Sequence, residues 1–283
     1  MNFVSYQQLC EDIVEWAKAL PRDFDLIVGV SRSGLLPAIL LSLHLNLPIS
    51  EIEAFRDGHI FEPGQRGKIP AEVNKVLVVD DTVLSGKTMR KVKNQLKDKD
   101  CSIKYAAVYS GKDTSHVDYF FKIVPILRCF QWNVMHANLM TNSCVDIDGV
   151  LCDPPTDAEN DDGQQYIKFL ENTKPLYIPT VKVKYLVTCR LEKYRDLTEK
   201  WLKQHKVKYD NLIMMDYPTK EARVKAGRHA SYKAEIYAKS NTELFIDDSP
   251  DQAKEISRIT HKPVLCVGNW TMYEEKGLKV EII

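Results

Sequence analysis

The chain has 283 residues, of which 44% are hydrophobic and 28% are charged. This composition is ordinary for a soluble globular protein and excludes an intrinsically disordered chain. Basic and acidic residues both total 39, so no net positive charge attracts nucleic acid, and we expect no nucleic-acid partner. A chain of this length can form two domains that each bury their own core.

Seven cysteines are scattered along the chain without a C-x-x-C pair, which indicates reduced thiols rather than disulfides or a zinc site. The N-terminal segment repeats apolar side chains at helical spacing and lacks the basic start and apolar core of a signal peptide. The most apolar run, residues 34–49, is interrupted by two prolines and is too short to cross a membrane. We therefore expect a cytoplasmic protein without a membrane partner.

Short apolar runs alternate with longer amphipathic segments along the whole chain. This alternation is typical of buried parallel strands in βαβ units. Strands are expected at residues 26–30, 75–81, 105–110, 143–151, 184–189, 212–216, 243–248 and 263–268. Helices are expected at residues 34–45, 88–96, 164–172, 191–204 and 250–260.

The strand pattern starts again near the middle of the chain. One series ends near Trp132 and a strand with acidic residues begins near Ser143, so we place a domain boundary at about residues 133–141. The sequence predicts an α/β protein with two Rossmann-like domains, residues 1–135 and 141–283. Each domain is expected to contain a mostly parallel sheet flanked by helices.

The first half contains a turn suited to a ribose phosphate. A predicted strand ends in two adjacent acids, Asp80 and Asp81, and leads through a polar turn into a helix. The turn and helix start comprise Thr82, Ser85, Gly86, Lys87 and Thr88. Backbone N–H groups there can hold a phosphate, with the Ser85 and Thr88 hydroxyls as further donors. The two carboxylates can accept hydrogen bonds from both ribose hydroxyls.

A second strand, tight polar turn and helix occupy residues 27–38. The turn consists of Ser31, Arg32, Ser33 and Gly34. A pyrophosphate can lie on the backbone amides of this turn, with Arg32 close by.

The stretch D-D-x-x-x-S-G-x-T at residues 80–88 and the stretch V-S-R-S-G-L-L-P-A at residues 30–38 together resemble the type I phosphoribosyltransferases. The first stretch looks like their signature for phosphoribosyl pyrophosphate (PRPP), and the second like their pyrophosphate loop, which often contains a non-proline cis peptide. The resemblance covers roughly residues 1–133 and implies displacement of pyrophosphate from C1 of PRPP by a ring nitrogen, with Mg²⁺ on the substrate oxygens. Purine 6-oxo enzymes are the most similar members, which implies that Lys112 contacts the base.

One position departs from the purine enzymes, because an acidic residue usually occupies the place of Leu84 and manages the purine N7 proton. The likeness also implies an aromatic side chain on the base, from Phe130 or Trp132. The loop at residues 61–70 is either a lid over PRPP or an ordinary exposed loop. A domain that binds PRPP or a nucleotide without turnover, and one whose acidic turn only caps a helix, are the alternatives for this half.

The second half contains an aspartate pair at the end of a predicted strand. Asp146 and Asp148 lie two residues apart, so both are expected to project to one side. Asp146 would attack phosphorus and coordinate Mg²⁺, and Asp148 would protonate the leaving oxygen and later activate water. Thr188 ends a later strand and is placed to hold a phosphoryl oxygen. Lys233, at an expected helix start, supplies a cation that neutralises the nucleophile and the phosphoryl group.

A further predicted strand ends in Asp247 and Asp248, whose carboxylates suit Mg²⁺. This ordered set resembles the haloacid dehalogenase (HAD) superfamily of phosphohydrolases over about residues 141–283. The resemblance implies that the metal ligands are Asp146, the backbone carbonyl of Asp148, and Asp248, with Asp247 in support and Asp251 farther out. Arg190 either touches substrate or is a solvated side chain. No insert is long enough for a large cap over the site.

The leading functional hypothesis is a bifunctional enzyme of nucleotide metabolism. The first domain would transfer phosphoribose from PRPP to a nucleobase, and the second would hydrolyse a phosphomonoester through an aspartyl-phosphate, with Mg²⁺ as cofactor. In series, the two reactions would convert a base to a nucleotide and then to a nucleoside. The alternatives are a phosphatase regulated by a non-catalytic PRPP- or nucleotide-binding domain, and a scaffold with relic sites. The oligomeric state is left open, a homo-oligomer included.

Overall fold

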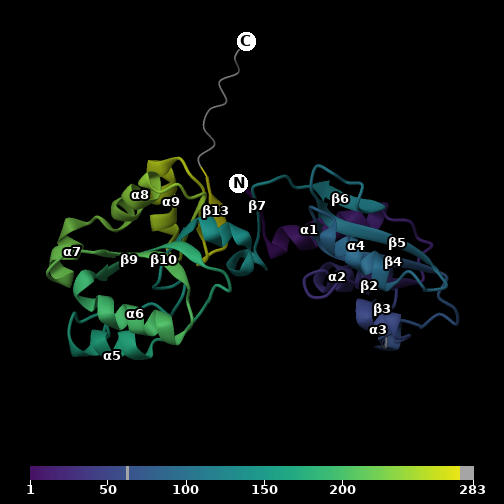
Figure 1. Ribbon diagram of the computed structural model, residues 1–283, viewed down its shortest axis with the longest axis horizontal. Helices are drawn as coiled ribbons and strands as arrows, with labels where there is room; N and C mark the ends of the chain where they lie inside the picture. Colours follow the sequence, from purple (N-terminus) through teal and green to yellow (C-terminus); the bar gives the residue numbers. More distant parts are fainter. Residues whose placement is uncertain (62–63, 275–283) are drawn as a thin grey trace, which may run out of the picture. The chain divides into compact units, whose positions relative to one another are not determined.

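The computed structural model describes residues 1–61 and 64–274 (Figure 1). The chain divides into two compact units, one from Asn2 to Trp132 and the other from Asn133 onward together with Met1. Each unit has its own sheet and its own apolar cores. No helix among the described residues is both long enough and apolar enough to cross a membrane.

The first unit is built on a five-stranded parallel sheet with the order β3-β2-β4-β5-β6. Its strands are β2 (Leu26–Gly29), β3 (Ile49–Glu51), β4 (Lys75–Val83), β5 (Ser102–Ser110) and β6 (Tyr119–Ile123). Two short strands, β1 (Asn2–Val4) and β7 (Arg128–Phe130), pair separately and in parallel. Strand order reverses between β2 and β4, which is where open α/β sheets bind ligands.

Helices cover both faces of this sheet. They are α1 (Tyr6–Ala19), α2 (Leu35–Leu45), α3 (Ile52–Arg56) and α4 (Lys87–Gln95). Because side chains alternate along a strand, Ile27 and Leu77 pack with α1 and α2, while Val28 packs with α3 and α4 on the other face. Nearly every residue of β2 and β4 is buried, which accounts for their continuous apolar sequences.

The second unit contains a six-stranded sheet with the order β10-β9-β8-β11-β12-β13. Its strands are β8 (Ser143–Val145), β9 (Val183–Leu191), β10 (Tyr209–Met215), β11 (Leu244–Asp247), β12 (Val264–Cys266) and β13 (Thr271–Tyr273). All pairings are parallel except that of the edge strand β13. Strand order reverses between β8 and β11, so residues that follow these two strands meet at one end of the sheet.

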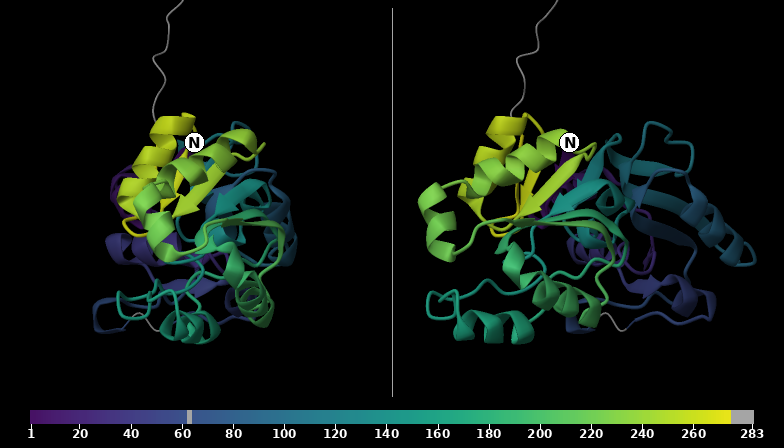
Figure 2. Two further views of the ribbon diagram at one scale, coloured as in Figure 1. Left: turned by 90° about the vertical axis from the view of Figure 1, so that its left-hand side faces the viewer. Right: turned by 60° about the vertical axis from the view of Figure 1, so that its left-hand side comes forward.

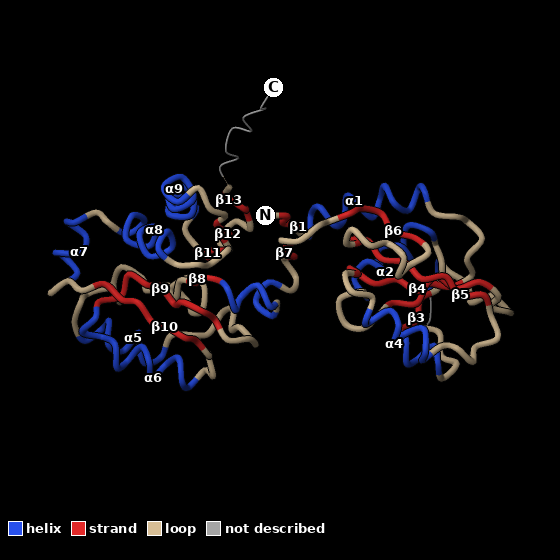
Figure 3. The backbone as a smooth tube through the Cα atoms, turned by 45° about the horizontal axis from the view of Figure 1, so that its top comes forward, coloured by secondary structure: helices blue, strands red, loops and turns tan. Residues whose placement is uncertain are grey.

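The helices of this unit are α5 (Gln164–Asn172), α6 (Arg195–Gln204), α7 (Lys220–Ala226), α8 (His229–Lys239) and α9 (Pro250–Thr260). Helices α8 and α9 lie on one side of the strands, and α5 and α6 lie on the other, as Figures 2 and 3 show. Ala234, Phe245 and Ile256 belong to the core on the first side. Phe169 and Met215 belong to the core on the second.

The fold class predicted from the sequence is confirmed, and most long elements lie within a few residues of their expected positions. The strand expected at 143–151 is wrong beyond Val145, because the chain turns at Gly149, whose φ is 77°. The helix expected from Leu191 begins at Arg195, because β9 continues to Leu191 and a 3₁₀ turn follows. Short strands such as β1 and β7 were not expected.

The segment that precedes α8 also differs from the prediction. Residues 217–229, where the sequence predicted no helix, contain α7, whose first turn is capped by the hydroxyl of Thr219. Lys233 lies in the second turn of α8 rather than at a helix start, because this helix begins at His229. Its side chain is therefore carried by a helix that packs on the core.

Candidate functional site

Three aspartates from two neighbouring strands meet at one end of the second sheet. Asp146 directly follows β8, and Asp247 ends β11, which pairs with β8. Carboxylate oxygens of Asp146, Asp247 and Asp248 all lie within 4.8 Å of one another. The switch point between β8 and β11 thus brings together acids that are about a hundred residues apart in sequence.

Lys233 joins two of these carboxylates. Its Nζ donates to Asp146 Oδ2 at 2.5 Å and to Asp247 Oδ2 at 2.7 Å, and all three side chains are almost fully buried. Although burial alone would lower the pKa of Lys233, the charges of Asp146 and Asp247 raise it well above its ordinary value. Burial raises the pKa of Asp146 to about 7, against the opposing effect of Lys233.

The donor set fits a divalent cation. Three carboxylates against one ammonium leave two negative charges without compensation in a buried place. Burial and the adjacent Asp247 also raise the pKa of Asp248. A hard cation with oxygen ligands, such as Mg²⁺, would supply the missing charge. Asp148 was expected as a ligand through its backbone carbonyl oxygen, and that role stays a prediction.

Gly149 gives Asp248 its place in this cluster. A Cβ atom on Gly149 would lie 2.1 Å from Asp248 Oδ2, and the φ of 77° is one that side-chain-bearing residues rarely adopt. Only glycine therefore allows the turn after Asp148 to pass so close to the Asp248 carboxylate.

Asp148 points to a different partner from Asp146. Arg190 Nε lies 3.1 Å from both carboxylate oxygens of Asp148, and Nη2 lies 2.6 Å from Oδ1. The Arg190 side chain is fully buried and also donates toward Thr198 and Cys152. Of the two alternatives for Arg190, the solvated side chain is wrong, because the residue is buried on β9 and pairs with Asp148. Its position two residues after Thr188, on the same face of a strand, was the signal for this.

A cavity of about 190 Å³ opens beside Asp146. Asp146, Asp148, Thr188, Lys233 and Asp248 all border it, so the structure brings these expected residues together. It also borders residues that the sequence reasoning missed, including Asn160, Tyr166, Arg223, His229 and Gln252. No sequence pattern marked this second group, because its members come from loops and helix starts without a strand motif. Asp251 is exposed on α9 and does not border the cavity.

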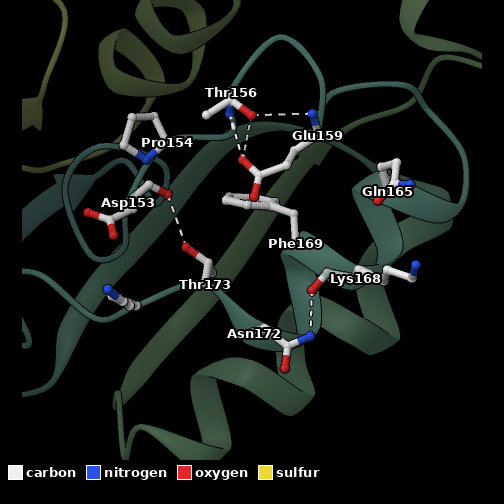
Figure 4. A pocket seen from close by; sticks show the side chains of 10 residues that line it. Asp153, Pro154, Thr156, Glu159, Gln165, Lys168, Phe169, Asn172 and Thr173 are labelled. Atoms are coloured by element: carbon white, nitrogen blue, oxygen red, sulfur yellow. Dashed lines mark hydrogen bonds between the residues drawn. The ribbon is translucent and has the colours of Figure 1, made fainter.

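A larger cavity of about 600 Å³ adjoins this one and is shown in Figure 4. It lies between the loop after Asp153 and helix α5, with the ring of Phe169 on its floor and Lys168 pointing away. Pro154 borders both cavities, and Tyr166 of the smaller one stacks on Phe169 of the larger one at 5.8 Å between ring centroids. The segment between β8 and β9 therefore supplies walls to both.

In the first unit, the two predicted phosphate turns lie side by side at the switch point of the sheet. Ser31, Arg32 and Ser33 follow β2, and Ser85 and Gly86 follow β4, the neighbouring strand. The peptide bond between Ser31 and Arg32 is cis. Gly34 packs so closely on β4 that a Cβ there would meet the Val79 carbonyl oxygen at 2.8 Å.

The start of α4 has no side-chain cap. Gly86 precedes this helix with a φ of 64°. Ser85, Lys87 and Thr88 are exposed around it. This geometry suits a phosphate on the backbone amides. Thr82 lies on β4 instead, and its Oγ1 is buried without a hydrogen-bond partner in the described part of the chain.

Asp80 and Asp81 are less accessible to a ligand than the sequence suggested. Asp80 and Asp81 retain only 6% and 2% of their exposure. Asp81 accepts from Trp132 Nε1 at 2.6 Å and from Ser33 Oγ at 3.0 Å, so both of its oxygens are engaged. Burial and the neighbouring Asp81 raise the pKa of Asp80 to about 8. Each oxygen of Asp81 thus has one protein donor in this conformation, and the ribose contacts expected of these acids stay a prediction.

Phe130 and Trp132, one of which was expected on the base, lie in one aromatic cluster with Tyr6 and Tyr109, and that role stays a prediction. Lys112 and Arg32 are exposed. Of the expected lid, Glu62 and Pro63 lie outside the described residues, and Gly64–Arg66 form a short 3₁₀ turn. The Ser31 hydroxyl donates to Glu51, an acid that the sequence reasoning did not consider.

Residues 5–139 match the family model of the phosphoribosyl transferase domain. This match contains both phosphate turns and the two buried acids of the first unit. It covers slightly less than half of the chain, so the phosphoribosyltransferase domain occupies the N-terminal part alone.

Several known proteins are similar to this part of the chain. A transcriptional regulator GfcR of Methanosarcina mazei is 26% identical over 109 residues, which are 37% of this chain and 53% of that protein. A GfcR of Methanococcoides burtonii is 29% identical over 96 residues, 32% of this chain and 47% of that protein. The chain thus spans about half the length of the curated relatives it matches.

Two solved structures are also similar. A purine phosphoribosyltransferase from Pyrococcus horikoshii Ot3 is 29% identical, with a TM-score of 0.35, and the match covers 46% of this chain and 92% of that one. A xanthine-guanine-hypoxanthine phosphoribosyltransferase of Helicobacter pylori is 26% identical, with a TM-score of 0.36 and coverage of 47% and 92%.

Proposed function

We propose that the second unit is a Mg²⁺-dependent, HAD-like phosphomonoesterase with Asp146 as nucleophile. The observation that carries this proposal is the ion-paired cluster in which Lys233 contacts both Asp146 and Asp247, with Asp248 within metal-binding distance. A cluster that only stabilised the fold would need no cavity beside it. This one borders a cavity that Thr188 and Asp148 also line. The chemistry of the donor set and its access to substrate support the same conclusion.

The proposed reaction has two steps. An Asp146 carboxylate oxygen attacks phosphorus, the bond to the leaving oxygen breaks, and Asp148 gives that oxygen a proton. Water then attacks the aspartyl-phosphate, returns a proton to Asp148, and releases phosphate with Asp146 restored. Lys233 holds Asp146 in place and offsets its charge, and Thr188 offers a hydroxyl to a phosphoryl oxygen. A Mg²⁺ ion bound by Asp146, Asp247 and Asp248 would supply charge neutralisation.

We also propose that the phosphoribosyltransferase domain transfers phosphoribose from PRPP to a nucleobase. The domain match, the two phosphate turns and the uncapped start of α4 support this activity. The nucleotide formed would then be a substrate class for the second unit, and its dephosphorylation would draw a reversible transfer forward. Leu84, with 43% of its surface exposed at the turn, leaves the identity of the base open.

A second candidate function is a phosphatase regulated by an N-terminal domain that binds PRPP or a nucleotide without turnover. Two observations favour it. Asp81 is engaged by Trp132 and Ser33, and the Methanosarcina and Methanococcoides relatives are named transcriptional regulators. A regulator can use the same ligand turns as an enzyme, so fold alone does not separate the two functions.

One experiment separates them. The purified chain is incubated with Mg²⁺, PRPP and, in turn, guanine, hypoxanthine, xanthine, adenine, orotate, uracil and nicotinamide. Pyrophosphate, orthophosphate, nucleotide and nucleoside are measured separately for the wild type and for Asp146→Asn.

Two sites acting in series would give pyrophosphate and nucleoside with the wild type, and the Asp146→Asn protein would stop at the nucleotide. If no base is consumed while a phosphomonoester still loses phosphate, the regulated phosphatase is the better account. Phosphate release that persists in Asp146→Asn would refute the proposed nucleophile.

A further inference from the structure

The cavity beside Asp146 contains a cation without an acidic partner. Arg223, on α7, borders the cavity, and no carboxylate oxygen of the described residues lies within 4 Å of its guanidinium nitrogens. Its Nη1 donates to the Cys189 carbonyl oxygen at 2.6 Å, which anchors the group next to Thr188. Its Nε is buried and has no hydrogen-bond partner in the part of the chain that the structure describes.

A second unsatisfied group lies on the wall of the same cavity. Gln252, in the first turn of α9, has its Oε1 buried without a hydrogen-bond partner among the described residues. Buried polar atoms are rarely left unpaired, and each one calls for an explanation. Both residues border the cavity beside Asp146, so a rotation of each side chain would bring its covered atom to a ligand there.

The transferring phosphoryl group cannot complete the hydrogen bonds of both Arg223 Nε and Gln252 Oε1. Its outer oxygens accept hydrogen bonds and donate none, so they leave the Gln252 oxygen without a donor. A hydroxyl group both donates and accepts, and it satisfies this amide in either orientation. The Gln252 oxygen therefore indicates a hydroxyl on the part of the substrate beyond the phosphoryl group.

Arg223 indicates that the part of the substrate beyond the phosphoryl group is negatively charged. A partly buried guanidinium without a counter-ion is best completed by an anion, for which it offers charge-assisted hydrogen bonds. His229 borders the cavity too, and its pKa is lowered by burial and by the positive charges of Arg223 and Lys233. The volume of about 190 Å³ is below the roughly 300–1,000 Å³ typical of sites for larger ligands. The group bound here is therefore compact.

We propose that the preferred substrate is a small phosphorylated polyol or sugar with a second anionic group, which Arg223 binds while Gln252 bonds a hydroxyl. This substrate class rests on the proposed phosphatase function of the same site, and it replaces the nucleotide as the preferred substrate, because a nucleoside monophosphate carries no second anionic group. The second anion is a carboxylate or a phosphate, since a guanidinium pairs with either. Arg223 and Gln252 are then specificity residues that contact the leaving group.

Binding can be tested without turnover in the Asp146→Asn protein. With Mg²⁺ present, calorimetry compares 3-phosphoglycerate with glycerol 3-phosphate, which differ only by a carboxylate in place of CH₂OH. A second pair, ribose 1,5-bisphosphate and ribose 5-phosphate, tests a phosphate as the second anion. Each pair is measured again with Arg223→Met, Arg223→Lys and Lys225→Met added, the last being an exposed lysine on the same helix.

The doubly anionic member of at least one pair should bind about tenfold to a hundredfold more tightly, as charge-assisted hydrogen bonds contribute. Arg223→Met should abolish this preference, Arg223→Lys should retain part of it, and Lys225→Met should leave it unchanged. Gln252→Leu should weaken all four ligands, because each carries a hydroxyl. The pair that shows the preference identifies the second anion.

Equal binding of both members of both pairs would overturn the proposal. So would an Arg223→Met variant that weakens both members of a pair equally, because Arg223 would then serve the phosphoryl group itself. Phosphate release by the wild type is measured in parallel. Tight, Arg223-dependent binding without any phosphate release would refute the phosphatase function but support the binding site. Phosphate release without a preference for the doubly anionic ligands would refute the proposed substrate class but support the phosphatase function.

Discussion

The indole nitrogen of Trp132 donates a hydrogen bond to Asp81, with 2.6 Å between Nε1 and Oδ2. Trp132 ends the first unit, and Asp81 belongs to the stretch that resembles a PRPP signature. A ribose hydroxyl that bonds this carboxylate must share its oxygens with the indole and the Ser33 hydroxyl, because each oxygen already accepts one hydrogen bond. The indole of Trp132 therefore competes with a ligand for Asp81 in the conformation observed.

We expect Trp132→Phe to bind PRPP more tightly than the wild type. Phenylalanine keeps most of the ring packing but has no N–H, so Asp81 is released, and a hydrogen bond to a charged group contributes about 1.5–3 kcal/mol. Calorimetry with PRPP and Mg²⁺ should show a gain of about tenfold. Trp270→Phe, in the other unit, is the matched control. Weaker binding by Trp132→Phe would show instead that the indole contacts the ligand.

The acid pair of the first unit should make its stability depend on pH. Burial and Asp81 raise the pKa of Asp80 from 3.8 to about 8, so the folded state holds this proton more tightly than the unfolded chain. Stability from this group is therefore present below about pH 4 and is lost as the pH rises toward 8. We expect Asp80→Asn, which cannot ionise, to be more stable than the wild type at pH 8 by about 1–3 kcal/mol.

Denaturant unfolding at pH 5 and pH 8, followed by Trp fluorescence, would measure this difference. Lys75, at the other end of β4, pairs with the exposed Asp23, so Asp23→Asn is a control in which little change is expected. An equal pH dependence of wild type and Asp80→Asn would show that Asp80 does not carry it.

Arg190 should act on catalysis through Asp148. Its guanidinium contacts both Asp148 oxygens, so it fixes the carboxyl group that would protonate the leaving oxygen. Asp148→Asn should slow hydrolysis of alkyl phosphates by about 10²–10⁴-fold. It should slow that of p-nitrophenyl phosphate far less, because a good leaving group needs no proton. We expect Arg190→Lys to show the same selective loss, more weakly.

The ratio of kcat values for alkyl and aryl substrates measures this effect. A purely structural role of Arg190 would lower both rates together and leave the ratio unchanged. Arg195→Lys is a suitable comparison, because Arg195 pairs with Glu192 and Glu199 near the surface, away from the cavity.

Asp248 should contribute much more to Mg²⁺ binding than the nearby Asp251. Asp248 lies within the carboxylate group and Asp251 does not, although both follow β11 closely. Asp248→Asn should weaken Mg²⁺ binding by more than tenfold, and Asp251→Asn should change it by less than about twofold. Calorimetric titration with Mg²⁺ measures both, and a chelator should abolish phosphate release. Equal losses in the two variants would place Asp251 at the metal.

The residues that the sequence identified are those carried by regular strand patterns. Asp146 and Asp247 lie at the ends of buried apolar strands, and periodicity and order were enough to predict that they meet. The prediction that Thr188 ends its strand is wrong, because β9 continues to Leu191. The partners Arg223 and Gln252 come from α7 and from the first turn of α9, where nothing in the local pattern indicates which way a polar side chain points. Their contribution depends on how helices pack, which periodicity does not specify.

The same limit applies to Trp132 and Asp81. Their separation of 51 residues and the short strand β7 before Trp132 gave no signal that the indole would reach β4. Arg190 is intermediate, since its alternation with Thr188 predicted its face of β9 but not its ion pair. Long-range contacts between polar side chains are thus where the sequence prediction stops.

The placement of the cluster has a consequence for how the second unit assembles its carboxylates during folding. Lys233 and Asp146 are 87 residues apart, and Asp146 meets Asp247 only when β11 pairs with β8. Such non-local strand pairing is slow, because the entropy of closing a long loop precedes any stabilising contact. Helices α8 and α9 can form earlier from local interactions alone. Recovery of Mg²⁺ binding after dilution from denaturant would therefore lag behind recovery of helical circular dichroism.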